Sequence, residues 1–262
     1  MIVLRYLKTF SVFLLVLSAM NSSAQLPPVT SGVFHWNELP VKKEEQRETR
    51  RIAEGTTSEF EYFEMHASTQ IKGALPRPPH TKKDIEEVII IKEGKVKCSI
   101  GNKTSILGAG SVILVPPLES QSFENIGDGP LTYYVFMFRS KKPMDMERSN
   151  KAGGTLLLNA DTISYTEKDG KGTKKYFDRS TAMCDNYEMH ITYLKQKGPS
   201  HAAHQHVDTE IILIIEGEMQ MNIDGVVYNG SNGDLFIAES GKMHQVINAA
   251  DKPCSYFAFK WR

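Results

Sequence analysis

The chain has 262 residues, and its 31 lysines and arginines balance 31 aspartates and glutamates, so the formal net charge is zero. This balance argues against a nucleic-acid-binding protein, which would carry an excess of basic residues. Hydrophobic residues make up 40% and aromatic residues 9% of the chain, which excludes the disordered and fibrous classes. A chain of this length can bury one large core or two smaller ones.

Residues 1–24 are typical of a secretory signal peptide. Arg5 and Lys8 form a basic start, and an apolar run over residues 10–20 is followed by small residues. The run is too short for a comfortable membrane span, so we expect none after cleavage. The expected mature chain, 25–262, has 262 − 24 = 238 residues, with 31 − 2 = 29 basic against 31 acidic residues and a net charge of about −2. We expect it in the periplasm or outside the cell.

The chain repeats itself at an interval of 124 or 123 residues, which indicates two homologous domains. The segment Glu64-Met65-His66 recurs as Glu188-Met189-His190 with an offset of 124. The later matches have an offset of 123: Glu87 with Glu210, Gly94 with Gly217, Gly110 with Gly233, Asn125 with Asn248, and 133–139 with 256–262. We expect a first domain over residues 25–150 and a second over 151–262, joined through a segment rich in charge and glycine.

Short strands and turn residues fill both halves, and helical periodicity is weak. In chain order the predicted strands are 88–92, 112–115, 133–139, 211–215, 219–223, 235–238 and 256–262. Asp224-Gly225 is a strong hairpin signal. Many short strands with glycine between them predict an all-β sandwich, barrel or double-sheet jelly roll. Residues 41–51 and 141–148 are expected to be linker or short helix.

Three histidines and one glutamate stand at short intervals in the second half. Residues two apart on a strand face the same side, so His204 and His206 are expected to point together. Glu210 is expected to face inward from the next strand, and His244 to arrive from a separate strand after a glycine turn. Such donors, without a thiolate, suit one divalent transition metal: Mn, Fe, Co, Ni, Cu or Zn. Four protein ligands leave up to two positions of an octahedron open, as catalytic sites require.

The spacing resembles the two signature motifs of the cupin superfamily, G-x5-H-x-H-x3-E-x6-G and G-x5-P-x-G-x2-H-x3-N. The first matches over 198–217 and the second over 233–248, with Glu239 in place of the proline. The resemblance covers both halves and implies two tandem jelly-roll barrels, a bicupin, that assembles as a homodimer. The metal ligands that it implies are His204, His206, Glu210 and His244.

The first half departs from this pattern. With the 123-residue offset, Thr81, Lys83 and Gln121 stand where the second half has histidines, and Glu87 keeps its place. A lysine ammonium has no lone pair to give a metal. We expect Lys83 to neutralise Glu87 or Glu86, and the first barrel to be structural or to bind a ligand without metal. A weak ion held by Glu87, Gln121 and His80 is the less favoured alternative.

Further candidates are weaker. His66 and His190 occur in both halves, which favours a structural role common to the two barrels. His201 precedes the ligands, as an exposed turn residue or as a group over the open face of the metal. Residues that could line the second cavity are Tyr193, Gln220, Tyr256, Asn248, and Met219 or Met221. Arg179 could bind a carboxylate at the mouth.

The three cysteines, Cys98, Cys184 and Cys254, are odd in number and widely spaced. They fit neither a thiolate zinc site nor a disulfide-rich scaffold. We expect them to be small buried residues, with at most one disulfide in an exported protein.

These observations predict an exported metal-dependent enzyme that acts on a small polar molecule, carboxylated or sugar-derived. Lewis-acid or metal-water chemistry would serve hydrolysis, isomerisation or a lyase-type reaction. A metal only in the second barrel is similar to the arrangement in ureidoglycine aminohydrolases, although the ligand pattern is general for cupins. Two alternatives stay open: a non-catalytic protein whose metal anchors a small molecule or carbohydrate, and a bicupin dioxygenase. The fold alone does not decide the metal, the substrate or the acid/base residue.

Overall fold

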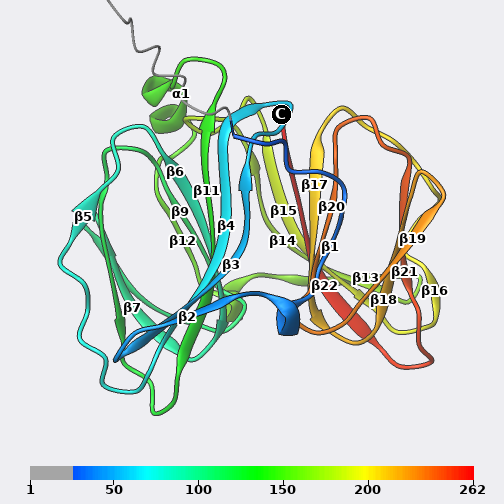
Figure 1. The fold of residues 1–262 in the computed structure, drawn as a ribbon, viewed down its shortest axis with the longest axis horizontal. Coiled ribbons are helices and arrows are strands. Elements are labelled where there is room, and N and C mark those ends of the chain that lie inside the picture. The colour runs from blue at the N-terminus through cyan, green and yellow to red at the C-terminus, as the bar shows by residue number, and fades with distance from the viewer. Residues whose placement is uncertain (1–25) are drawn as a thin grey trace, which may run out of the picture.

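Strands account for nearly all regular structure in the computed structural model, which describes residues 26–262 (Figure 1). The predicted signal peptide lies outside the described residues. Within residues 26–262 the elements other than strands are one α-helix, α1 (Met146–Lys151), and two 3-10 turns, η1 (Trp36–Glu38) and η2 (Ala160–Thr162). In this part of the chain no helix has the length and apolar character needed to cross a membrane. The all-β prediction is confirmed.

The first barrel combines a seven-stranded and a four-stranded antiparallel sheet. The large sheet has the order β12-β9-β6-β11-β4-β3-β2, and the small sheet the order β5-β10-β7-β8. The large-sheet strands are β2 (Val41–Lys43), β3 (Arg47–Gly55), β4 (Phe60–Gln70), β6 (Glu86–Glu93), β9 (Val112–Val115), β11 (Leu131–Ser140) and β12 (Leu156–Leu158). The small-sheet strands are β5 (His80–Thr81), β7 (Lys95–Ile100), β8 (Lys103–Gly108) and β10 (Ser120–Asn125).

The second barrel repeats this plan. Its large sheet has the order β1-β20-β17-β22-β15-β14-β13, and its small sheet the order β16-β21-β18-β19. The large-sheet strands are β1 (Gly32–Phe34), β13 (Tyr165–Lys168), β14 (Lys171–Arg179), β15 (Tyr187–Leu194), β17 (Thr209–Glu216), β20 (Leu235–Ala238) and β22 (Cys254–Trp261). The small-sheet strands are β16 (Gly198–Pro199), β18 (Met219–Ile223), β19 (Val226–Gly230) and β21 (His244–Asn248).

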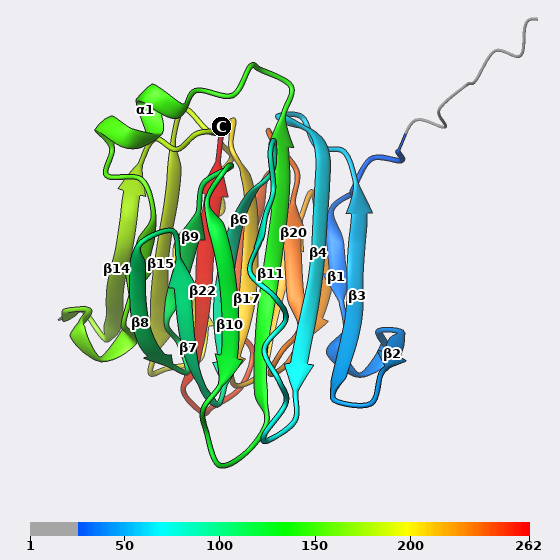
Figure 2. The ribbon, with the colours of Figure 1, turned by 90° about the vertical axis from the view of Figure 1, so that its left-hand side faces the viewer.

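The two large sheets face each other in the middle of the molecule, and the small sheets lie on the outside (Figure 1). Seen from the side of the first barrel, β7, β8 and β10 lie in front of that barrel's large sheet (Figure 2). Side chains alternate across each strand, so β17 sends Ile211 and Leu213 into the core between the barrels and Ile212 and Ile214 into the barrel interior. A strand buried on both faces reads as one continuous apolar run.

The barrels exchange one strand each. β1, from the first half, pairs with β20, and β12, from the second half, pairs with β9. β1 and β12 are 124 residues apart, so they are equivalent elements of the repeat, and the sheets cross the expected domain boundary in both directions. Glu239 belongs to this junction, because it accepts hydrogen bonds from the backbone N and Oγ of Ser31 at 2.8 and 2.9 Å. That contact explains the glutamate where the motif has proline.

Several expectations need correction. Residues 41–51 are not linker or helix but belong to β2 and β3. Residues 141–148 are linker followed by the start of α1. The cysteines are buried as expected, but all three are free, so the optional disulfide does not form.

Glu86 lies at the barrel interface and is fully buried. Its Oε2 accepts hydrogen bonds from Oγ1 of Thr181 at 2.7 Å and from the backbone N of Met183 at 2.9 Å. Burial raises the pKa of this carboxyl to about 7, and the hydrogen bonds oppose the rise only in part. The folded protein therefore holds a proton on Glu86 at a pH where the unfolded chain has released it.

Glu86 should make the protein less stable as pH rises from about 4.5 to 7. In this window the native state binds more protons than the unfolded state, so the free energy of unfolding falls, by something of the order of 3 kcal/mol in total. Glu86→Gln removes this titration. Urea denaturation at pH 4.5 and pH 8 should show a smaller loss of stability for the variant than for the unmodified protein. An identical loss in both would contradict the assignment.

Candidate metal centre

The four predicted ligands come from three places in the second barrel. Glu210 lies near the start of β17, and His244 opens β21 after Gly241, whose φ is +78°. We had expected His204 and His206 on a strand, but they do not lie on a regular one. They occupy the segment between β16 and β17, where His204 forms an isolated bridge with His244. This bridge, rather than strand alternation, holds the segment against β21.

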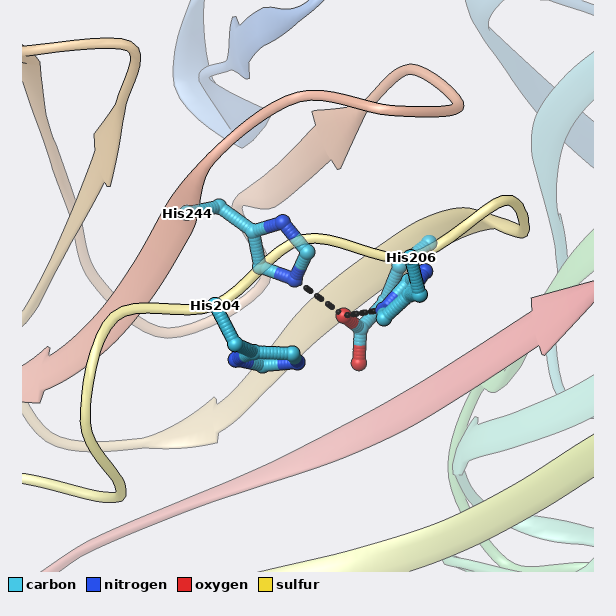
Figure 3. A group of neighbouring side chains, drawn as sticks. His204, His206 and His244 are labelled. Atoms are coloured by element: carbon cyan, nitrogen blue, oxygen red, sulfur yellow. Dashed lines mark hydrogen bonds and ion pairs between the residues drawn. The ribbon is translucent and has the colours of Figure 1, made fainter.

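The structure brings all four side chains together, with one donor atom from each within 4.8 Å of the others. Oε2 of Glu210 lies 2.8 Å from Nε2 of His244 and 3.3 Å from Nε2 of His206. Figure 3 shows the three histidine rings grouped around this carboxylate. His244 and Glu210 are buried, whereas His204 and His206 are partly exposed, so the group opens toward the solvent on the side of these two histidines.

Hydrogen bonds set the tautomers of two of the rings. Nδ1 of His206 lies 3.0 Å from the carbonyl oxygen of Asp208, and Nδ1 of His244 lies 2.8 Å from that of Lys242. When these rings are neutral, as a metal requires, each Nδ1 donates its proton to the carbonyl and Nε2 carries the lone pair. Two such lone pairs point at a carboxylate oxygen. Three electron-pair donors in contact fit a cation between them.

The charges of the group respond to one another. Burial alone would raise the pKa of Glu210. Without an ion, hydrogen bonds from His206 and His244 in their charged form, in which Nε2 is a donor, bring it well below its ordinary value. Burial would likewise lower the pKa of His244, but the hydrogen bond to Glu210 raises it overall. For His204, burial and the neighbouring His201 lower the pKa. A neutral His204 beside an ionised Glu210 is the state in which both can bind a divalent ion.

Further polar side chains lie on the same interior face of the large sheet. Lys260 on β22 stands directly opposite Glu210 on one side and Glu188 on the other. Its Nζ lies 3.5 Å from Oε2 of Glu188, and Nδ1 of His190 lies 3.3 Å from Oε1 of the same carboxylate. The sequence reasoning missed Lys260 and Glu188. The signal was present, because Lys260 has the strand parity of Tyr256 and stands where the first half has Met137.

The weaker candidates divide into interior and exterior residues. Tyr256, Met219 and Met221 belong to the interior core of the second barrel, as expected. Tyr193 points to the other face of β15, against the core between the barrels, and does not line the cavity. Gln220 donates a hydrogen bond to Asn229 on the outside of the small sheet, so it does not line the cavity as we had expected.

Three other candidates have local partners. Asn248 is fully buried and donates to the carbonyls of Gln196 and Lys252, so it holds two chain segments together. Arg179 donates to the carbonyl of Gly154 at 2.7 Å, in the segment that joins the two halves. The ring of His201 packs edge-on against His204, with 4.5 Å between the ring centroids, at the partly exposed side of the group.

The first barrel has an equivalent site, but its residues do not correspond to those of the second barrel with the 123-residue offset that we had used. β10 pairs Gln121 with His80, and Thr81 takes the neighbouring position opposite Ser120. In the second barrel the corresponding bridge joins His244 to His204. His80, and not Thr81, is therefore the counterpart of His204. The offset at this point is still 124.

Lys82, and not Lys83, neutralises Glu87. Its Nζ lies 3.0 Å from Oε1 of Glu87, while Nε2 of Gln121 donates to Oε2. Lys83 is exposed. A lysine does balance the charge of this glutamate, but the prediction named the wrong one of two neighbouring lysines. The reason is that the segment from Lys82 to Glu87 is one residue longer than the segment from His206 to Glu210.

Comparisons with known proteins agree with this geometry. The model of the cupin domain matches residues 69–137 and 190–260. AerE from Microcystis aeruginosa is 12% identical, with a TM-score of 0.67 over 88% of this chain and 99% of that one. The protein Ylba from E. coli is 16% identical, with a TM-score of 0.68 over 92% and 95%.

A mutant of oxalate decarboxylase OxdC from Bacillus subtilis is 14% identical, with a TM-score of 0.66 over 88% of this chain and 77% of that one. At these identities the likeness shows the fold. No curated protein matches the chain in sequence.

Metal analysis of the purified protein should find about one transition ion per chain. Glu210→Gln replaces an anionic donor by a neutral amide, so it should weaken metal binding by more than the ~10–100-fold that follows loss of an outer hydrogen-bond partner. Removal of the metal should also lower the melting temperature. The matched variant Glu87→Gln should keep the full metal content. Two ions per chain, or equal losses in the two variants, would contradict the assignment.

Proposed function

The chain belongs to the cupin superfamily, and from that premise we propose that its second barrel is the active site of a metal-dependent enzyme. The proposed substrate is a small polar molecule that carries a carboxylate or is derived from a sugar. The reaction is hydrolysis, isomerisation or a lyase-type step, each of which requires a proton to be moved. This proposal rests on a row of charged residues on three neighbouring strands. The row begins at the proposed ligand Glu210 and continues through Lys260 to Glu188.

The four clustered side chains, His204, His206, Glu210 and His244, would hold the ion. A divalent ion in such a site supplies Lewis-acid polarisation of a substrate oxygen or activation of a water molecule. The partly exposed side of the group, beside His201, is where a small molecule would enter.

Lys260 provides a fixed positive charge for a carboxylated substrate. Residues directly opposite on neighbouring strands have Cβ atoms about 5 Å apart, which places Lys260 next to Glu210. Glu188 engages one of the three ammonium donors, and the others can bind an oxyanion. The first barrel has Met137 at this position, so the charge is specific to the barrel with the histidines.

His190 and Glu188 form the proposed proton-transfer pair. The hydrogen bond from His190, together with the charge of Lys260, lowers the pKa of Glu188 to about 2 against the effect of burial, so this carboxylate is ionised at neutral pH. It accepts the proton of Nδ1 and leaves Nε2 of His190 to take a proton from the substrate. His66 and Glu64 form the same pair in the first barrel, with 2.9 Å between Nδ1 and Oε1. That pair has no lysine on the neighbouring strand.

Export accompanies this proposal. It rests on the basic start and the apolar run of residues 1–24.

The test is a screen of uronic acids, keto-sugars and ureido compounds with metal-loaded protein. At least one class should turn over, and removal of the metal should abolish turnover. His190→Gln should lower kcat by about 10²–10⁴-fold, the usual contribution of a general acid or base. Its metal content should stay the same. The matched change in the first barrel, His66→Gln, should leave kcat unchanged.

Lys260→Met installs the first barrel's own residue and should raise KM for a carboxylated substrate by about tenfold or more, through loss of a charge-assisted hydrogen bond. Equal kcat/KM in the Lys260→Met and unmodified proteins would exclude this role for the lysine. Saturable binding to the metal-loaded protein without turnover of any class would instead favour a non-catalytic binding protein.

A further inference from the structure

A cavity of about 180 Å³ lies inside the first barrel, the barrel without the histidine set. It is smaller than the roughly 300–1,000 Å³ of pockets for drug-sized ligands. Its walls combine side chains of β3, β4, β6, β10 and β11 with those of the segment 77–82, which contains β5. The cavity therefore suits a single small molecule.

The charged side chains that line this cavity are mainly basic. They are Arg47, Arg77, Lys82 and Glu87, with a sum of 3 − 1 = +2 when the histidines are neutral. Lys82 is matched by Glu87 at 3.0 Å. Arg77 has only a loose contact with Glu44, 3.5 Å between Nη2 and Oε2, and Nη2 of Arg47 donates to a backbone carbonyl. The two guanidinium groups therefore leave positive charge that attracts an anion.

Two buried amides in the cavity wall lack partners for their oxygens. Gln70 and Gln121 are each 2% exposed, and Oε1 of each has no hydrogen-bond partner among residues 26–262. Their Nε2 atoms are used, by the hydroxyl of Tyr133 and by Glu87. A buried acceptor without a donor costs about 1–3 kcal/mol. Both oxygens are themselves buried, so a molecule with hydroxyl or amino donors would satisfy them once the two amides turn toward the cavity.

The rest of the wall combines the polar side chains of Thr49, His66, Ser68, His80 and Ser122 with an apolar, aromatic surface. Phe123 and Tyr133 lie 5.7 Å apart between ring centroids, and Ile89 and Val135 complete the surface. Such a wall suits the C–H face of a ring or chain rather than an inorganic ion. A metal is not expected here, because the ammonium of Lys82 stands where the second barrel has His206.

We propose that the first barrel is a second, metal-free binding site for a small hydroxylated carboxylate of the sugar-acid type. Arg47 and Arg77 bind the carboxylate, and the oxygens of Gln70 and Gln121 accept hydrogen bonds from its hydroxyl groups. The second barrel has Lys171 at the position of Arg47 and Leu194 at that of Gln70, so this combination belongs to the first barrel alone. The proposal does not depend on the function of the metal centre.

The test is isothermal titration of the full chain carrying Glu210→Gln, which removes the metal centre as a second binding site. The probes are D-glucuronate, D-galacturonate, D-gluconate and lactate, with D-glucose as the uncharged match for glucuronate. At least one acid should bind with one site per chain, and glucose should bind at least about tenfold more weakly. Arg77→Met should weaken acid binding at least about tenfold, and so should Arg47→Met.

Controls separate this site from the rest of the molecule. Arg77 has a largely exposed side chain, 63%, so its replacement should not disturb folding. An unchanged melting temperature checks this. Lys171→Met, the counterpart of Arg47→Met in the second barrel, should leave the affinity unchanged. Affinity unaffected by Arg77→Met and Arg47→Met, or no binding of any of the four acids up to about 10 mM, overturns the proposal.

Discussion

A buried carboxylate at the start of an inner strand sets the chemistry of both barrels. Glu87 is 4% and Glu210 is 9% exposed, and each faces the barrel interior. A buried charge without a partner is costly, so each glutamate requires a positive charge beside it. In the first barrel the ammonium of Lys82 provides it at 3.0 Å. In the second barrel the corresponding position is His206, and we propose that a divalent ion takes the place of the ammonium.

The lysine in the first barrel and the proposed ion in the second give the same architecture different functions. A lysine ammonium fills its place permanently, so the first barrel can recognise a ligand only through hydrogen bonds and charge. An ion held by three histidines and a glutamate keeps open positions for a substrate oxygen. The strand exchange joins the two barrels physically, because β20, which pairs with β17 and its Glu210, is covered at its other edge by β1 of the first half. Neither barrel is complete without the other half of the chain.

The sequence predicted the fold class and the convergence of His204, His206, Glu210 and His244, because apolar runs and fixed motif spacing report burial and strand order directly. It could not predict β2, whose residues are exposed, or β3, whose residues are mostly polar and partly exposed, because neither strand has an alternating pattern. The strand exchange was also hidden, since β1 and β12 are equivalent elements of the repeat and the sequence does not show which barrel each one joins.

The predicted correspondence between residues of the first site and residues of the metal centre was wrong for a related reason. The offset changes from 124 to 123 between the position of Lys82 and that of Glu87, and motif spacing alone does not show on which side of Lys82 the extra residue lies. Backbone pairing of His80 with Gln121 settles it. Lys260 was missed because a lone lysine on an aromatic strand carries no motif. Glu188 was noticed only as part of the repeated Glu-Met-His segment, without its lysine partner.

Anomalous X-ray diffraction from crystals of the metal-loaded protein, recorded at the absorption edge of the bound element, would locate the ion directly. We expect one strong anomalous peak per chain, enclosed by His204, His206, Glu210 and His244, and no peak beside Glu87. A peak of similar height next to Lys82 and Glu87, or no peak among the histidines, would contradict it.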